Sequence, residues 1–290
     1  MSWLDLHMHS VVSMDGEFTP EQLVSIAHQA GVKVMAISDH NITDGVEAGV
    51  EAARERNMIS IPAVELDLAH ENRNFHILGY GIDPNHRELK DFCNQIRENK
   101  VHTGALRMER MHELGYYFDD DKVWEIASQK HVIMPDILKV IFEDHRNDGN
   151  EILEPYRTHP MAGVAFYWDH CARPDSEGYI PEGNLPVEEG IQLIKQAGGV
   201  PILAHPGANM GENKEMFLSL LEAGVEGVEA FCSYHQHGED QFYYDLAKKY
   251  EVLFTQGSDF HGKLKPQISA GSIETGLEEE IYRNLRERLD

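Results

Sequence analysis

Cysteine is scarce in this 290-residue chain, and the three cysteines that occur, Cys93, Cys171 and Cys232, lie far apart. Their number is odd and no two of them form a Cys-x-x-Cys pair. This argues against a disulfide framework and against a zinc site built from thiolates. Free cysteines are compatible with a reducing compartment, so we expect the protein to be cytoplasmic.

Long hydrophobic runs are also missing from the sequence. No apolar stretch approaches the ~18 residues that a membrane-spanning helix requires. The N-terminal residues Met-Ser-Trp-Leu-Asp lack the basic and apolar regions of a secretory signal peptide. We therefore expect neither a membrane span nor secretion.

Positive charge is in short supply, with 25 Lys and Arg residues against 50 Asp and Glu residues and a formal net charge of −25. Binding along a nucleic acid backbone or onto an anionic membrane requires a basic surface, so neither a long nucleic acid nor a membrane is an expected partner. Histidine, by contrast, is abundant, with 17 residues. Many imidazoles together with many carboxylates are a typical ligand supply for divalent metal ions. The oligomeric state leaves no pattern in the sequence.

Strand-like and helix-like segments alternate over most of the chain. A helix is predicted to begin at Thr19, because Pro20 suits the first helical position and Gln22 completes a capping box. Seven strands are predicted, at residues 3–10, 32–38, 59–66, 75–80, 200–204, 227–232 and 252–256. Helices join most of these strands, which predicts parallel βα units in a barrel or in an open doubly wound sheet.

The alternation stops between residues 86 and 185. Helical patterns at 87–114, 121–128 and 135–145 are followed by a loop-rich stretch at 147–183. We expect residues 1–85 and 186–290 to form the strand-containing domain, and residues 86–185 to be a mainly helical insertion. Such insertions usually grow from the loops that carry the site, so this one is expected to cover the active site.

Polar residues gather where the predicted strands end. On the first strand, a period of two places Asp5, His7 and His9 on one face. Two histidines so spaced can chelate one ion, and Asp5 could accept a hydrogen bond from a histidine ring. The other strands end in, begin with or lead to Asp39-His40, Glu65, His76, His205, His235 and Asp259-Phe260-His261. A single histidine after a strand is usually only hydrogen-bonded, but this joint placement predicts a site for several metal ions.

The same residues resemble, in the same order, the motifs of the PHP (polymerase and histidinol phosphatase) superfamily. The motifs are Asp5-x-His7-x-His9, Ser38-Asp39-His40, Glu65, His76, Ala204-His205-Pro206 and Asp259-Phe260-His261. The resemblance implies an α/β fold, a distorted (β/α)7 TIM-like barrel, that binds two or three divalent metal ions, Mn, Zn or Fe. It also implies a metal-dependent phosphoric ester hydrolase, because the stand-alone members of the family hydrolyse phosphate esters.

The resemblance implies three metal positions. The first would be held by His7, His9, Glu65 and Asp259. Glu65 would bridge to a second position, completed by His76 and His205. The third would be held by Asp15, His40 and His261, although some relatives have histidine where Asp15 stands.

The expected chemistry follows from the charge of the ions. A water that bridges two metals loses its proton near neutral pH and becomes the nucleophile, while the ions take up charge on the phosphoryl oxygens. His235 is a candidate general acid or phosphate contact. Asp39 either orients His40 or acts as a base, and the sequence leaves both roles open.

Basic residues of the insertion resemble those of the stand-alone branch that includes nucleotide phosphatases and a short-RNA exonuclease. Arg107 and Arg110 look like its basic helix, and Lys130-His131 looks like its basic-histidine motif. The implied role is an anion clamp on the substrate, since arginine suits phosphate oxygens. One departure is Ala208, which stands where nucleotide-processing relatives often carry arginine.

The leading hypothesis is therefore a metal-dependent phosphoesterase that acts on a small phosphate mono- or diester, such as a nucleotide, a cyclic phosphate or a similar metabolite. One alternative is an exonuclease acting on short oligonucleotides, and another is a histidinol-phosphate phosphatase. An amidohydrolase that cleaves C–N bonds is disfavoured, because the bridging lysine typical of that class has no equivalent here.

Overall fold

The computed structural model describes residues 1–13, 15–128, 131–173, 175–181, 184–236 and 238–290. The chain divides into two compact units. A strand-containing unit comprises Met1–Asn94 and Asn184–Asp290, and a helical unit comprises Gln95–Gly183.

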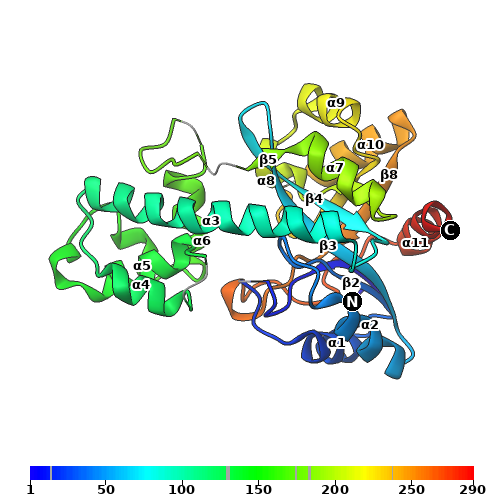
Figure 1. Cartoon of the computed structure of the whole chain (residues 1–290), viewed down its shortest axis with the longest axis horizontal. Helices are drawn as coiled ribbons and strands as arrows, with labels where there is room; N and C mark the ends of the chain where they lie inside the picture. The colour runs from blue at the N-terminus through cyan, green and yellow to red at the C-terminus, as the bar shows by residue number, and fades with distance from the viewer. Residues whose placement is uncertain (14, 129–130, 174, 182–183, 237) are drawn as a thin grey trace. The chain divides into compact units, whose positions relative to one another are not determined.

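The strand-containing unit is a mixed α/β, nearly closed barrel (Figure 1). Its strands are β1 (Leu4–Met8), β2 (Val34–Ile37), β3 (Ile59–His70), β4 (Arg73–Tyr80), β5 (Leu185–Pro186), β6 (Val200–Leu203), β7 (Gly227–Cys232) and β8 (Leu253–Gly257). The order around the barrel is β1-β2-β3-β4-β6-β7-β8, and the two-residue β5 pairs with β3 outside this path. A parallel bridge between Met8 and Phe260 links the first and last strands. The expected barrel is thus confirmed, and the open doubly wound sheet is excluded.

One strand, β4, breaks the expected parallel arrangement, because it is antiparallel to both of its neighbours. β3 and β4 form an antiparallel hairpin whose tight turn contains Glu71 and Asn72, with φ values of 47° and 60°. Two consecutive residues with positive φ are typical of a type I′ hairpin turn. β4 is also antiparallel to β6, so it begins at the edge of the barrel where the parallel strands end. His76, near the start of β4, is thereby brought to that edge.

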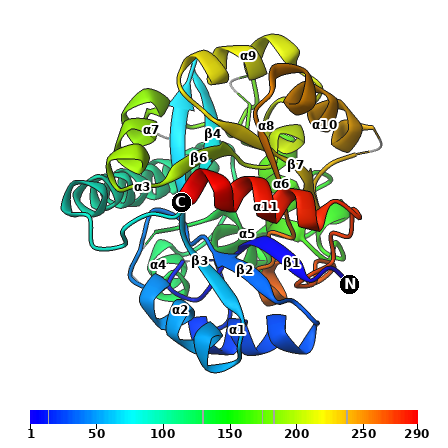
Figure 2. The ribbon, with the colours of Figure 1, turned by 90° about the vertical axis from the view of Figure 1, so that its right-hand side faces the viewer.

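Helices cover the outside of this barrel. They are α1 (Pro20–Gln29), α2 (Val46–Glu55), α7 (Val187–Gln196), α8 (Pro206–Met210), α9 (Lys214–Glu222), α10 (Glu239–Tyr250) and α11 (Glu278–Leu289). The predicted start of α1 is confirmed, since Thr19 and Gln22 form both bonds of a capping box. α1 and α2 lie side by side, and α11 crosses in front of the strands in Figure 2. Leu23, Val24 and Ala27 of α1 are fully buried against the sheet.

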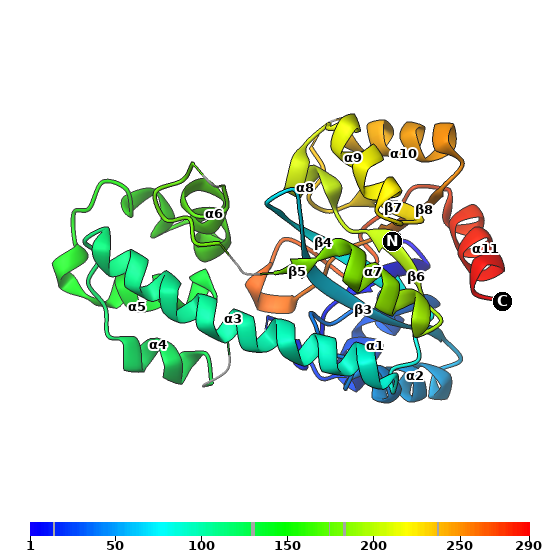
Figure 3. The same ribbon diagram turned by 45° about the horizontal axis from the view of Figure 1, so that its top comes forward.

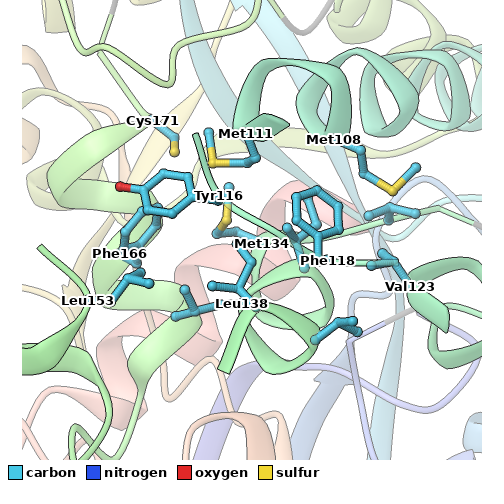
Figure 4. Close-up of a cluster of buried hydrophobic side chains, with 14 of the residues drawn as sticks. Met108, Met111, Tyr116, Phe118, Val123, Met134, Leu138, Leu153, Phe166 and Cys171 are labelled. Carbon is cyan, nitrogen blue, oxygen red and sulfur yellow. The ribbon is translucent and has the colours of Figure 1, made fainter. Parts of the chain in front are cut away.

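The helical unit has a hydrophobic core of its own (Figure 4). Its helices are α4 (Asp120–Ile126), α5 (Met134–Glu143), α6 (Ala162–His170) and the greater part of α3 (Arg87–Glu113). α3 begins in the strand-containing unit and is unbroken over its 27 residues (Figure 3). Met111, Leu138 and Phe166 are almost fully buried in the core. α6 lies in the stretch expected to be loop-rich. It was missed because Met161, which precedes it, gives no side-chain cap and its residues show little amphipathic pattern.

The three cysteines are free and buried, so the expected absence of a disulfide framework is confirmed. Among the described residues, no helix is long and apolar enough to cross a membrane.

Two isoleucines of β3 provide a matched test of the barrel core. Ile61 is 7% exposed and Ile59 is 48% exposed. We expect Ile61→Ala to lower the free energy of unfolding by about 3 kcal/mol, because it leaves a cavity in the core. Ile59→Ala should change it by less than ~0.5 kcal/mol. Urea denaturation measures both, and equal losses in the two variants would contradict this packing.

Candidate metal centre

Histidine and carboxylate side chains converge at the edge where the parallel strands end. The first group joins His7 of β1 and His9, which directly follows β1, to Glu65 of β3 and to Asp259, which follows β8. The Nε2 atoms of His7 and His9 are 3.1 Å apart, and each lies 3.2 Å from Glu65 Oε2. Asp259 Oδ1 is 3.3 Å from His7 Nε2 and 2.9 Å from His9 Nε2. Ligands around a tetrahedral ion with bonds of about 2.0 Å are about 3.3 Å apart, so these atoms form a cage of the size that one divalent ion requires.

Glu65 also belongs to a second group, with His76 of β4 and His205 after β6. Glu65 Oε1 is 3.0 Å from His76 Nδ1 and 3.0 Å from His205 Nε2. Glu65 therefore faces the first group with Oε2 and the second group with Oε1. This is the arrangement that a bridging carboxylate needs.

The third group contains His9, Asp15, His40 and His261. Asp15 Oδ2 is 3.0 Å from His261 Nε2 and 3.5 Å from His40 Nε2. Ser13 supports this arrangement, because its hydroxyl donates to Asp15 Oδ1 and accepts the backbone N–H of His40. The loop between β1 and α1 is thus tied to the loop after β2.

A fourth group includes a carboxylate that the sequence analysis missed. Asp67 Oδ1 is 3.1 Å from His40 Nδ1 and 3.1 Å from His76 Nε2. Asn41 holds this carboxylate, since its side-chain amide donates to Asp67 Oδ2 and its Oδ1 accepts the Asp67 N–H. The signal was a second acid two residues after Glu65 on the same strand. It was overlooked because the expected strand ended at residue 66, whereas β3 continues to His70.

Hydrogen bonds from Nδ1 orient the rings of His7 and His205. His7 Nδ1 donates to Glu229 Oε1 at 2.9 Å, and His205 Nδ1 donates to Asn209 Oδ1 at 3.0 Å. In the neutral, metal-binding tautomer of each ring, Nε2 would carry the lone pair and face the carboxylates. Glu229 Oε2 also accepts the backbone N–H of His205 at 2.9 Å, so one fully buried carboxylate links the first and second groups. An acid inside the otherwise apolar strand β7 was the available signal.

Two aspartates that were expected beside histidines instead hold serines. Asp5 accepts both the N–H and the Oγ–H of Ser258, at 2.9 and 2.7 Å, and the N–H of Gly271. Asp39 accepts the N–H and the Oγ–H of Ser10 in the same way, at 2.6 and 2.7 Å. Each aspartate thereby fixes the segment that follows the neighbouring strand, and Ser10 and Ser258 directly adjoin predicted metal ligands.

The backbone at the ligands is tightly constrained. His205 and Asp259 have positive φ values of 25° and 54°, which non-glycine residues adopt only when the surrounding structure enforces them. Gly257 ends β8 against His7 and Glu229. A Cβ atom at this position would lie 2.2 Å from His7 Cβ and 2.5 Å from Glu229 Oε1, so only glycine fits.

Two acids of the site, Glu65 and Asp259, are held ionised. Burial favours the neutral form of Glu65, but the imidazoles of His40 and His7 hold its pKa well below the usual range. Burial likewise opposes ionisation of Asp259, but nearby positive charges keep the pKa of that carboxyl low, and the Lys265 ammonium contributes most. The centre therefore presents negative charge to any cation that enters it.

The pKa values of two imidazoles, His40 and His261, are shifted in opposite directions. Burial opposes a charged His40 ring, but the carboxylates of Glu65, Asp67 and Asp15 raise its pKa to about 10. Burial, and then a nearby lysine ammonium, lower the pKa of His261 to about 4. A cation that binds through His40 must therefore displace a proton, whereas His261 is already neutral.

The residues fit a polynuclear metal centre. His40 Nδ1, Glu65 Oε2 and Asp259 Oδ1 are buried and have no hydrogen-bond partner within the described part of the chain. Such atoms are costly unless something compensates them. Imidazole nitrogens and carboxylate oxygens are suitable donors for first-row divalent ions.

The residues considered for acid–base chemistry lie in defined surroundings. The ring of His235 is buried, its Nδ1 donates to Asp240 Oδ1 at 2.7 Å and its Nε2 accepts the N–H of Gly207 at 3.2 Å. Both nitrogens therefore engage neighbouring helices, Nδ1 the first turn of α10 and Nε2 the first turn of α8. Lys265 lies beside the predicted ligands Asp259 and His261, and no pattern in the sequence indicated it.

The predicted substrate contacts belong to the helical unit. Arg107 is buried, with its guanidinium 5.5 Å from the ring centroid of Tyr167. Arg110 forms an ion pair at 2.8 Å with a glutamate one turn further along α3. His131 is half-buried, and Lys130 lies outside the described residues. Their role as an anion clamp remains a prediction.

Comparison with known proteins defines the class. The model of the PHP domain matches residues 5–287, so the chain belongs to the PHP domain family. It is a hydrolase of that family, a phosphoesterase, with buried histidine, aspartate and glutamate clusters.

Curated relatives resemble the chain over most of their length. The chain is 26% identical to phosphoribosyl 1,2-cyclic phosphate 1,2-diphosphodiesterase of Eggerthella lenta, over 89% of this chain and 94% of the relative. It is 26% identical to 3′,5′-nucleoside bisphosphate phosphatase of Chromobacterium violaceum, over 100% of this chain and 98% of the relative. It is 29% identical to the 5′-3′ exoribonuclease Rnm of Salmonella typhimurium, over 89% of this chain and 84% of the relative.

Solved structures share the fold. An amidohydrolase from Chromobacterium violaceum with bound sulfate and no metal superposes with a TM-score of 0.77 at 23% identity, covering 99% of this chain and 97% of that one. A metal-dependent phosphoesterase from Bifidobacterium adolescentis gives a TM-score of 0.77 at 24% identity, covering 98% and 96%.

Glu229 provides a test of ligand orientation. We expect Glu229→Gln to weaken metal affinity by about 10- to 100-fold, because the His7 ring loses its charged acceptor. Equilibrium dialysis with metal analysis measures the change. The exposed Glu222→Gln is the control and should bind metal as the wild type does. Unchanged affinity in Glu229→Gln would show that this contact does not tune the site.

The raised pKa of His40 predicts how metal binding depends on pH. Below a pKa of about 10 the free ring carries a proton that a metal ligand cannot keep, so affinity should rise with pH. The rise should be about tenfold per pH unit for each proton displaced. Calorimetry at pH 7.5 in two buffers of different ionisation enthalpy counts the protons, and a count of zero would contradict the assignment.

Proposed function

We propose that the protein hydrolyses a small phosphate mono- or diester at a centre of two or three divalent ions. The observation that carries this proposal is Glu65, whose two oxygens face two different groups of histidines at 3.0–3.2 Å. Two cations held by these residues would suit phosphoryl transfer, because together they would take up negative charge on the reacting phosphate oxygens.

The proposed ligands are those of the first three groups. They are His7, His9, Asp15, His40, Glu65, His76, His205, Asp259 and His261. Bound Mn, Zn or Fe ions would draw charge from the phosphoryl oxygens and lower the pKa of water. The chain itself supplies the orientation, since Glu229 and Asn209 fix two of the rings and Ser13 fixes the loop that carries Asp15.

Other parts of the proposal concern the substrate. We propose His235 as a general acid or phosphate contact, Asp39 as the residue that orients His40 or acts as a base, and Arg107, Arg110, Lys130 and His131 as substrate contacts. We further propose that the insertion at residues 86–185 covers the active site.

The substrate proposed is a small phosphorylated metabolite. The relatives named for a cyclic phosphate and for a nucleoside bisphosphate support this class. A second candidate is exonuclease activity on short oligonucleotides, which the relative named as an exoribonuclease supports. The net charge of −25 disfavours long nucleic acids. A cytoplasmic location accords with the free cysteines.

Release of hydrolysis products from a panel of compounds, either inorganic phosphate from a monoester or a monoester from a diester, tests this function and is followed by chromatography. The panel contains a nucleoside monophosphate, a 3′,5′-bisphosphate, a cyclic phosphodiester, a short oligonucleotide, a sugar phosphate and histidinol phosphate. We expect release from at least one small ester by the metal-loaded protein. Metal loading without release from any member would overturn the proposal.

Glu65→Gln tests the role of the shared carboxylate. We expect a loss of at least about 10³-fold in kcat, because the amide cannot give an anionic oxygen to each group. The fold should persist, which circular dichroism checks. Glu55→Gln, exposed on α2, is the control and should retain full activity. Normal turnover by Glu65→Gln would refute the bridging role.

A further inference from the structure

Lys265 is the one lysine buried among the described residues. It follows the short turn Gly262–Leu264, and its side chain is 11% exposed. Lys265 Nζ lies 2.9 Å from Asp259 Oδ2 and 3.4 Å from His261 Nε2. A buried ammonium group destabilises the fold unless opposite charge or hydrogen bonds compensate it. The burial of Lys265 beside the predicted metal ligands therefore requires an explanation.

The surroundings of the ammonium group hold it in place. The ring of Tyr234 lies beneath it, with the centroid 4.9 Å from Nζ, and an aromatic face attracts a cation. Asp259 turns its other oxygen, Oδ1, toward His7 and His9. One carboxylate thus faces a lysine on one side and the first metal group on the other.

The ring of His261 connects Lys265 to the third group. His261 Nδ1 donates to the backbone oxygen of Asp259 at 2.8 Å, which leaves a lone pair on Nε2. Nε2 lies 3.0 Å from Asp15 Oδ2, which is also an acceptor. Two acceptors at this distance need a cation beside them. A metal ion at the third position and the Lys265 ammonium would therefore both interact with His261 Nε2.

We propose that Lys265 is a resident cation that competes with a divalent ion for the third position, formed by His9, Asp15, His40 and His261. Its charge repels an ion at that position and its N–H groups compete for the His261 lone pair. The protein then holds two ions firmly and the third weakly. This inference rests on the proposed metal centre.

Binding of Mn²⁺ to the metal-free full-length protein tests the inference. The variant Lys265→Met removes the charge and keeps the length of the side chain, and Lys265→Gln is a second neutral replacement. Lys265→Arg keeps the charge. Lys263→Met is the matched control, because Lys263 lies two residues away with 89% of its side chain exposed. Equilibrium dialysis with metal analysis gives the number of ions and their affinities.

The wild type should bind two Mn²⁺ ions and a third at least tenfold more weakly. In Lys265→Met and Lys265→Gln the third ion should bind at least tenfold more tightly than in the wild type. Lys265→Arg and Lys263→Met should resemble the wild type. An unchanged third affinity in both neutral variants would overturn the inference, as would weaker binding of the first two ions. These Mn²⁺ affinities are measured without turnover. Inactivity of the protein on every ester would therefore refute the proposed function without changing the measured affinities.

Discussion

The mutual neutralisation of buried carboxylates and imidazoles is the constraint on which the rest of the structure depends. Glu65 has no exposed surface, yet the rings of His7, His9, His76 and His205 lie within 3.2 Å of its oxygens. A carboxylate so placed is tolerable only with compensating positive charge. The strands that carry these side chains must therefore meet at one edge of the barrel. The antiparallel β4 meets this requirement because its histidine, His76, lies near its beginning rather than at its end.

The second requirement is rigidity. Asp5 and Asp39 each fix the serine after a neighbouring strand, and Glu229 joins a ring of the first group to the backbone of the second. The strained backbone at His205 and Asp259 is held by these contacts. These contacts fix the backbone beside the predicted ligands His9, His205 and Asp259 and orient the ring of His7.

Much of the fold and of the candidate site followed from local pattern. Strand period and the capping box at Thr19 located the strands and α1, and polar residues at strand ends marked the histidines and acids that the structure gathers. The hairpin was missed because its Glu71-Asn72 turn lacks glycine, and Asp67 was missed with it. Glu229 gave only the signal of an acid inside an apolar strand, because its partner His7 lies 222 positions away in the sequence. Lys265 was missed because its place beside Asp259 and His261 depends on the turn at Gly262–Leu264.

The hydrogen bonds of β1 span almost the whole chain. Asp5 binds Ser258 and Gly271, which lie 253 and 266 positions further on. A ribosome makes the N-terminal strand first, at about 5–20 residues per second. During most of synthesis β1 therefore has one neighbour, β2, and the partners on its other side do not yet exist. His7 and His9 cannot meet Asp259 on a nascent chain. Assembly of the site, and with it the acquisition of metal, must wait until Asp259 and His261 have emerged.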